Sequence, residues 1–381
     1  MLLRRIKRKK AKEKVCWCGS GKKFILCHGN VGHQEKVKIS DIIKDFNQSF
    51  TKDKCYAPDI YHDECSSNII GAHTVSKSTN LKHIAKDNHV YCFSPNLGEI
   101  VKNEGKIEVE KKSIKKTSTF YGFCSHHDTK LFLPLDQGVQ LDPEHLFLNH
   151  YRIISRELYL KERIAQFQST KFKSYDKSKT PHEQLHHQIT TDLIFTGTDT
   201  ARKDLQQIKI AMDKMLVSND YSQLRYYALV IDTPPEIMSA GVWHATSDFE
   251  NTQLIDLTDL ETSYNSISAS TLFYLENKGV ILFSWIEGVF DCPECYKFIQ
   301  SLNNLSREDQ IKAVIYWLFA SNENIYFSPE WWDSLSSDQR QQLIDIFQGT
   351  VKSVPNYLKY KTLNNNIVDW TIEKVETNID L

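Results

Sequence analysis

Residues 16–28 read Cys-Trp-Cys-Gly-Ser-Gly-Lys-Lys-Phe-Ile-Leu-Cys-His, and this stretch decides how the amino-terminal end of the chain folds. Cys16 and Cys18 stand one residue apart, and Cys27 and His28 follow as an adjacent pair. Three thiolates and one imidazole are a ligand set that tetrahedral structural zinc takes. The Gly-Ser-Gly turn lets the chain reverse, so that the second pair reaches the first. Because so short a segment has no core, we expect zinc to supply most of its folding energy.

The same stretch resembles the SEC-C motif, a small zinc-binding module found on the preprotein translocase motor ATPase and on many unrelated bacterial proteins. The resemblance rests on the four ligands and on the residues between them, which are Gly19, Ser20, Gly21, Lys22, Lys23 and Phe24. It covers only a short part of the 381 residues. It implies zinc binding and a docking role, toward a protein partner or the ribosome, rather than catalysis.

A second group of metal-binding residue types follows between residues 55 and 128. The preferred ligands of a second zinc ion are Cys55, Cys65, Cys124 and His127. The alternatives for one of these ligands are His62, Cys92 and His126, and a further alternative is that Cys65, Cys92 and Cys124 are ordinary buried thiols. The gap between the first two preferred ligands is wider than the usual two to four residues.

The order of elements around these ligands is typical of a treble-clef zinc site. The Cys-x-x-His pair opens an apolar run at 131–133, which predicts the first turn of a helix. Alternating Lys/Glu-rich sequence around Glu99–Lys116 predicts a β-hairpin before it. An early ligand pair, a hairpin and a late pair that opens a helix together form this pattern.

Residues 55–135 resemble, more loosely, the HNH endonucleases, whose ββα-metal fold is a treble-clef variant. In that family a histidine at the end of the first strand activates water, and further His or Asn residues hold a divalent metal on the scissile phosphate. The resemblance implies that His73 is the general base and that Asn88 and His89 are candidates for the middle Asn of the family or for a metal ligand. It also implies that His126 and Asp128 are candidates for the late metal-binding position. The sequence departs from the family pattern, because Ala72 precedes His73, no Gly-rich loop follows, and the late pair ends in His.

Charge and metal-binding residue types are distributed unevenly along the chain. Residues 1–150 carry 25 Lys and Arg against 17 Asp and Glu, whereas the remainder carries 22 against 31. Seven of nine cysteines precede residue 125, which favours zinc over disulfides in a chain without a secretion signal. The basic start lacks an apolar stretch after it, and no run of eighteen apolar residues occurs. We therefore expect a cytoplasmic protein with no membrane partner.

A dense cationic arm precedes the first ligand pair. Its residues include Arg4, Arg5, Lys7, Arg8, Lys9 and Lys10. Such an arm neutralises phosphates and gives sequence-independent affinity for nucleic acid, to which Trp17 and Phe24 would add base stacking. The alternative is a solvated tail that keeps the chain soluble.

The remaining residues predict helices and a sheet without a recognised catalytic sequence. Helical periodicity runs from about 142 to 168 and from 181 toward 215. Five β-branched or aromatic runs predict a four- to five-stranded, mostly antiparallel sheet; they lie at 226–231, 241–245, 254–257, 271–275 and 280–285. Further helices are predicted after Ser306, after Ser328 and over 338–347, and the polar segment after Tyr360 is expected to be a frayed tail.

The sequence thus predicts an α+β protein with three parts. These are a basic arm and zinc knuckle (1–35), a treble-clef or HNH-like zinc unit (50–140) and a mixed helical and antiparallel-sheet domain (141–360). The leading hypothesis is a bacterial zinc protein of the defence or stress type that binds one to two zinc ions and engages nucleic acid or the ribosome. A narrower hypothesis is an HNH-like nuclease, which would also need magnesium or manganese. The alternative is a non-enzymatic adaptor with two structural zinc sites, which docks a protein partner through the knuckle or the acidic half.

Overall fold

The computed structural model describes residues 14–381 apart from 19, 35, 52–53, 94–105, 171, 260, 275–276, 351–355 and 365. The chain divides into two compact units. Unit 1 comprises residues 1–51 and 160–203, and unit 2 comprises residues 52–159 and 204–381. The combination of helices with antiparallel sheets confirms the predicted α+β class.

Unit 1 is helical apart from the zinc knuckle. It contains the short helices η1 (Phe24–Leu26), η2 (Val31–His33) and η5 (Phe172–Ser174), the helix α2 (Ile39–Ser49), and parts of α6 (Pro143–Thr170) and α7 (Pro181–Ser218). The predicted helices over 142–168 and from 181 toward 215 match α6 and α7. Each of these two helices contributes residues to both units.

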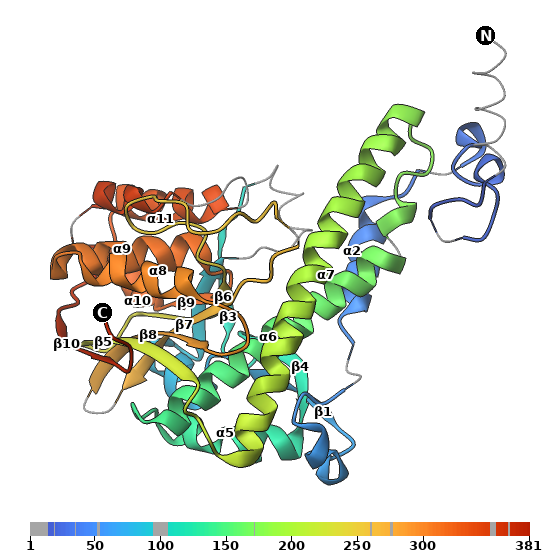
Figure 1. Ribbon diagram of the computed structural model, residues 1–381. Helices are drawn as coiled ribbons and strands as arrows, with labels where there is room; N and C mark the ends of the chain where they lie inside the picture. The colour runs from blue at the N-terminus through green and yellow to red at the C-terminus, as the bar shows by residue number, and fades with distance from the viewer. Residues whose placement is uncertain are drawn as a thin grey trace. The chain divides into compact units, whose positions relative to one another are not determined.

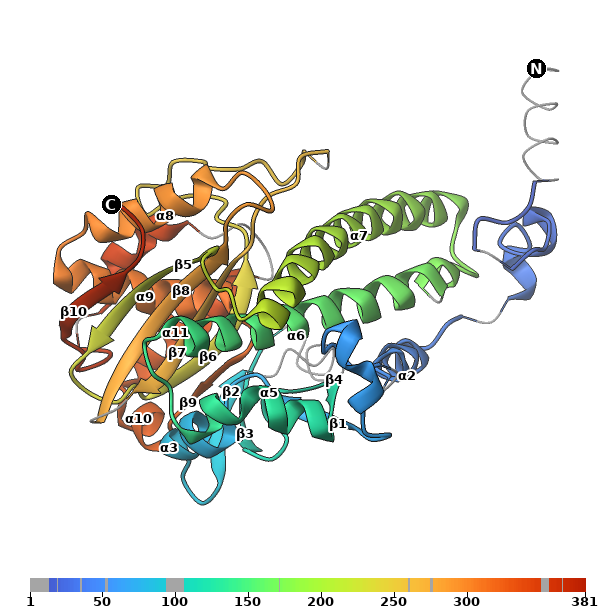
Figure 2. The same ribbon diagram turned by 60° about the horizontal axis from the view of Figure 1, so that its bottom comes forward.

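Unit 2 is built on an eight-stranded antiparallel sheet with the order β10-β5-β8-β7-β6-β9-β2-β3. Its strands are β2 (His89–Phe93), β3 (Val109–Ser113), β5 (Leu224–Ile231), β6 (Ile237–Trp243), β7 (Ile267–Tyr274), β8 (Lys278–Ile286), β9 (Ile325–Phe327) and β10 (Ile372–Thr377). A separate two-stranded sheet pairs β1 (Ile69–His73) with β4 (Thr119–Cys124). In the turned view of Figure 2 the long strands β5, β8 and β7 lie side by side.

Unit 2 contains nine further helices and helical turns among its described residues. They are η3 (Asp59–Glu64), the π-helical turn η4 (Lys77–Leu81), α3 (Lys82–Ile84), α5 (Ser125–Gln137), α8 (Pro293–Asn303), α9 (Arg307–Ser321), α10 (Pro329–Ser334), α11 (Ser337–Thr350) and η7 (Tyr357–Thr362). Ser306 caps α9 by accepting a hydrogen bond from the Asp309 backbone, and Ser328 caps α10 in the same way. The predicted helix starts at these two serines are confirmed.

The two faces of the large sheet are covered differently. Helices α8, α9 and α11 gather on one side (Figure 1), where their apolar side chains and those of the strands form the main hydrophobic core. On the other side, α6 places His150 against the hydroxyl groups of Ser268 and Ser284, at 2.5 and 3.0 Å from Nδ1. Serine hydroxyl groups of two neighbouring strands thus make part of this buried face polar.

Three sequence expectations about this sheet are wrong. The sheet has eight strands rather than four or five, because β2, β3, β9 and β10 join it from outside the predicted range. Residues 254–257 lie outside any strand, and Asp256 begins a turn by accepting hydrogen bonds from the backbone and side chain of Thr258. The segment after Tyr360 is not a frayed tail, because β10 pairs with β5.

The same sheet takes β2 and β3 from the predicted zinc unit, β5 to β9 from the predicted third part, and β10 from the segment after that part. The division into three domains stays a prediction. No helix in the described part of the chain is long and apolar enough to cross a membrane.

Protonation of His150 is expected to destabilise the fold as the pH falls. Burial lowers the pKa of His150 to about 3, whereas a histidine in an unfolded chain has a pKa of about 6.5. Below that pH the unfolded state binds a proton that the folded state does not bind. The free energy of unfolding should therefore fall by about 1.4 kcal/mol for each pH unit. Urea unfolding between about pH 7 and pH 5 measures this slope.

The His150→Asn variant removes the titrating group and should show a shallower slope than the wild type. His182→Asn, at an exposed histidine of α7, is the control and should keep the wild-type slope. Protonation of metal ligands at low pH affects all three proteins alike, so the difference between slopes isolates His150. Equal slopes for the wild type and His150→Asn would contradict the prediction.

Candidate metal centres

The first predicted ligand set converges in unit 1. Cys16, Cys18, Cys27 and His28 are all buried, and their ligand atoms lie within 4.8 Å of one another. Nδ1 of His28 is 3.0 Å from Sγ of Cys16 and 3.4 Å from Sγ of Cys27, and the Sγ atoms of Cys18 and Cys27 are 3.6 Å apart. Tetrahedral zinc with its usual bond lengths separates such atoms by about 3.5–3.8 Å. The donor set and its spacing therefore fit a zinc ion.

Backbone contacts close the loop that carries these ligands. Gly21 has φ +69°, a conformation that favours glycine, and it sits in the turn between the two ligand pairs. The Cys16 backbone donates to the carbonyl of Lys22, and the Phe24 backbone donates to the carbonyl of Lys14. The predicted reversal of the chain through the glycine-containing turn is thus present.

Local hydrogen bonds prepare Cys27 for a metal. Burial works to raise the pKa of its thiol, but the hydrogen bond from Ser20 and the contacts with the other ligand side chains outweigh burial and lower this pKa to about 6. The hydroxyl group of Ser20 lies 3.4 Å from the sulfur. Since the thiolate is the form that binds metal, this environment favours coordination near neutral pH.

The aromatic side chains of the knuckle pack against its sulfur atoms. Trp17 and Phe24 contact each other with ring centroids 4.7 Å apart, and both pack on the cysteine cluster. The rings therefore form a small apolar core. Their predicted role in base stacking is not tested by this packing.

Sequence reasoning missed a buried acidic partner of this centre. Asp176 lies between α6 and α7 in unit 1, and its Oδ1 atom is 2.5 Å from Nε2 of His28. Both side chains are completely buried. The segment from 169 to 180 has no sequence signal beyond its polarity, which predicts only a loop.

The second predicted ligand set converges in unit 2. The ligand atoms of Cys55, Cys65, Cys124 and His127 also lie within 4.8 Å of one another. Nδ1 of His127 is 3.6, 3.4 and 3.2 Å from the sulfur atoms of Cys55, Cys65 and Cys124, in that order. Three sulfur atoms around one imidazole nitrogen again fit tetrahedral zinc. Of the alternatives, His62, Cys92 and His126 lie outside this group.

Secondary structure positions the late ligand pair. Cys124 ends β4 and is the cap residue of α5, where its sulfur accepts a hydrogen bond from the His127 backbone. The predicted first turn of a helix is confirmed. The strand that pairs with β4 is β1, with Ile69 opposite Cys124.

The predicted hairpin around 99–116 is corrected in part. Residues 99–105 lie outside the described residues, and the described part carries β3. β3 pairs with β2 in the large sheet rather than with a ligand-bearing strand. The ligands of the second centre are therefore held by the separate β1–β4 pair, η3 and α5.

A buried lysine fixes the backbone next to Cys55. Nζ of Lys209 donates to the carbonyl of Tyr56, to the hydroxyl of Tyr151 and to Oδ1 of Asp213, at 2.6–2.7 Å. Burial lowers the pKa of Lys209, but all three ammonium hydrogens have acceptors. The ammonium group thus ties the segment that carries Cys55 to α6 and α7.

Three of the residues that the HNH resemblance implies, His73, Asn88 and His89, make local contacts with backbone groups. Nε2 of His73 lies 3.0 Å from the carbonyl oxygen of Ile114, and burial lowers the pKa of His73. The carbonyl of Asn88 accepts from the Ile114 backbone, and Nδ1 of His89 is 2.7 Å from the carbonyl of Asp87. Among the described residues, His73 and His89 belong to none of the His, Cys, Asp and Glu groups that could hold a metal.

The two candidates for the late metal-binding position, His126 and Asp128, lie in different environments. Nε2 of His126 is 3.3 Å from Oε2 of Glu64 at the surface, beside Lys130. Burial raises the pKa of Asp128. The ligand atoms of His126, Glu64 and His127 lie within 4.8 Å of one another, and the ammonium group of Lys130 forms an ion pair with Glu64.

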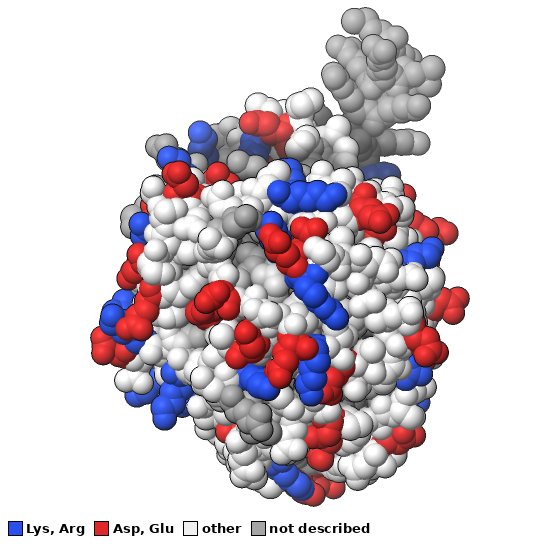
Figure 3. Space-filling view, turned by 90° about the vertical axis from the view of Figure 1, so that its left-hand side faces the viewer, with Lys and Arg blue, Asp and Glu red and all other residues white. Residues whose placement is uncertain are grey.

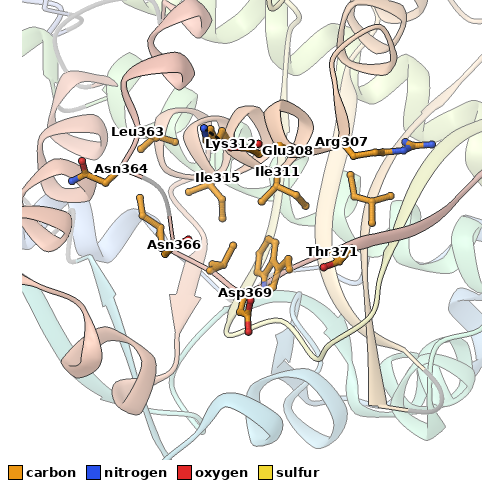
Figure 4. A pocket seen from close by; sticks show the side chains of 14 residues that line it. Arg307, Glu308, Ile311, Lys312, Ile315, Leu363, Asn364, Asn366, Asp369 and Thr371 are labelled. Carbon is orange, nitrogen blue, oxygen red and sulfur yellow. Dashed lines mark ion pairs between the residues drawn. The ribbon is translucent and has the colours of Figure 1, made fainter.

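A cavity of about 370 Å³ lies elsewhere in unit 2, between α9 and residues 363–372. Figure 4 shows Ile311 and Ile315 of α9 pointing into it. Two of its charged lining residues, Glu308 and Lys312, form an ion pair at 3.0 Å. Arg307 and Asp369 also line the cavity, so its lining combines apolar and charged side chains.

One known family matches the first centre. Residues 14–30 match the family model of the SEC-C motif. The match includes all four ligands, so the resemblance is confirmed for this segment of the chain. The match does not extend to the second centre or to the large sheet. No curated protein and no solved structure matches the chain.

Purified protein is expected to contain two zinc ions per chain. Replacing Cys124 by Ser removes one thiolate from the second centre and should lower the content to one. Cys92→Ser, at a buried cysteine outside both groups, is the control and should keep two. Elemental analysis measures all three proteins. If the wild type and Cys124→Ser each contained one zinc ion per chain, the second centre would be excluded.

Proposed function

We propose that this chain is a zinc-dependent binding protein whose basic unit engages nucleic acid or a ribonucleoprotein. The observation that supports this most strongly is the separation of charge between the units. Unit 1 carries 21 Lys and Arg against 9 Asp and Glu, a net charge of +12, whereas unit 2 carries 26 against 39, a net charge of −13. A compact basic unit attracts the phosphate backbone at long range.

Exposed lysines near the zinc ligands contribute to this charge. They are Lys14, Lys22, Lys23, Lys36 and Lys38. Two of them, Lys22 and Lys23, lie in the loop that the metal ligands close. Arg4, Arg5, Lys7, Arg8, Lys9 and Lys10 of the arm lie outside the described residues, so their contribution is an expectation from the sequence.

The second candidate function is a protein-interaction adaptor, which an apolar stripe on α7 favours. Leu185, Ile189 and Leu193 follow one another at four-residue spacing and are each more than half exposed. Of the fourteen large hydrophobic side chains exposed among the described residues, eight belong to unit 1. Unit 1 thus exposes both basic and apolar side chains, and a ribonucleoprotein offers phosphates and protein to such a unit.

Unit 2 supports the adaptor hypothesis less strongly than unit 1 does. The face shown in Figure 3 carries acidic side chains interspersed with basic ones. The acidic charge is therefore spread over this face and not gathered into one patch. Docking through an acidic patch of the carboxyl-terminal half stays a prediction.

The nuclease hypothesis stays a prediction of the HNH resemblance. If this chain is a nuclease with His73 as its base, His73→Ala should abolish cleavage of nucleic acid in magnesium or manganese. The zinc content of this variant should stay at the wild-type value. The contact between His73 and Ile114 does not supply the divalent metal site that this chemistry needs. Absence of cleavage by the wild-type protein in either metal would exclude the hypothesis.

Reversing two charges of the knuckle should weaken binding to a fluorescent single-stranded RNA. In Lys22→Glu/Lys23→Glu we expect the affinity at low salt to fall on the order of tenfold, because two cations that neutralise phosphates are replaced by anions. The slope of log affinity against log salt should shrink by about 0.7 for each phosphate that the variant leaves without a lysine. Fluorescence anisotropy at several salt concentrations measures both quantities.

The matched control is Lys359→Glu/Lys361→Glu, which changes the net charge equally at two lysines of η7 in unit 2. It should bind RNA like the wild type. If both double variants bind RNA equally weakly, binding follows net charge alone and unit 1 is not the binding surface. If the wild type does not bind RNA at low salt, the adaptor becomes the leading hypothesis.

A further inference from the structure

The zinc knuckle has a partner far along the chain. Oδ1 of Asp176 lies 2.5 Å from Nε2 of His28, and neither side chain has any solvent exposure. Asp176 belongs to the connection between α6 and α7, within the same compact unit as the knuckle. The SEC-C match ends at residue 30, so nothing in the motif accounts for this carboxylate.

The two nitrogen atoms of His28 have separate roles. Nδ1 faces the sulfur atoms of Cys16 and Cys27, at 3.0 and 3.4 Å, and is the atom positioned to bind the metal. Nε2 therefore carries the proton and faces the carboxylate of Asp176. A carboxylate behind a metal-binding histidine fixes the tautomer and the orientation of the ring, and it makes the ring a stronger ligand. A buried carboxylate without such a partner would be costly.

Further hydrogen bonds join the same two segments. The side chain of Gln184, in the first turns of α7, donates to the carbonyl of His28 at 3.0 Å and to the carbonyl of Asp176 at 3.4 Å. The side chain of Gln34 accepts from the Ser178 backbone at 3.0 Å and donates to the carbonyl of Cys27. The knuckle is thus attached to the α6–α7 connection by polar contacts that all begin at or near the metal ligands.

We propose that Asp176 is a positioning residue of the first zinc centre, and that zinc binding is coupled to the docking of residues 172–187 on the knuckle. The functional zinc module of this chain is then the SEC-C motif together with the α6–α7 connection. Coupling is reciprocal: if zinc stabilises the docked connection, the docked connection strengthens zinc binding by the same factor. This inference rests on metal binding by the knuckle and is independent of what unit 1 binds.

The first test compares the rate at which a coloured chelator removes zinc from full-length variants. Asp176→Asn keeps the shape of the side chain but removes its charge, and we expect the zinc affinity of one of the two centres to fall 10- to 100-fold. Asp192→Asn is the matched control, because Asp192 is an exposed residue of α7 whose ion pair with Lys173 is as long as 3.9 Å. It should release zinc like the wild type. Asp176→Glu restores the charge and should recover part of the affinity, which a merely structural role would not predict.

The second test measures hydrogen exchange of the wild-type protein with and without zinc. Residues 172–187 should lose protection when zinc is removed, whereas the strands β5, β8 and β7 in the core of unit 2 should keep theirs. This measurement decides the proposal even if Asp176→Asn fails to fold. Unchanged protection of residues 172–187, or equal zinc release by Asp176→Asn and Asp192→Asn, would overturn it. RNA binding is measured in neither test, so failure here leaves the proposed function standing.

Discussion

Coordination of one ion by three sulfur atoms and one nitrogen is the constraint on which the amino-terminal third of this chain depends. Around the first centre the described residues offer only a small apolar cluster, in which Trp17 and Phe24 pack on three cysteines. Such a cluster buries too little surface to offset the entropy of ordering the loop. Metal coordination therefore has to supply the remaining free energy that orders the loop. Unlike apolar contacts, it fixes the directions of the ligand atoms as well as their distances.

The second centre uses the same coordination to join segments that are distant in sequence. Its ligands come from the chain before and after η3 and from the start of α5. The buried ammonium group of Lys209 then connects the backbone beside Cys55 to two long helices. The polar contacts around both centres follow one rule: each fixes a ligand or its neighbouring carbonyl group, which limits the positions that the ligand can take.

The ligands of the first centre could be predicted from the sequence because their spacing is local and their chemistry is narrow. Those of the second centre are distant from one another in sequence and were predicted from their residue types and from the order of the elements around them. The helices α6 and α7 could be predicted because their apolar residues recur with helical periodicity. Asp176 could not be found, since an aspartate in a polar loop has no feature that shows a partner many residues away. β10 was missed because an edge strand keeps charged residues such as Glu373 and Lys374 on its exposed side. β9 was missed because three residues are too few to show a period.

The position of β9 in the sheet has a consequence for the order in which the chain can fold. Residues 325–327 pair with β6 on one side and with β2 on the other, so β2 and β3 have no place in the sheet until β9 exists. During synthesis the ribosome therefore releases β2 and β3 long before their neighbour emerges. Pairing over such a separation is slow, and unpaired strand edges meanwhile favour association with other chains. The early strands of this protein therefore depend on a neighbour that is translated much later.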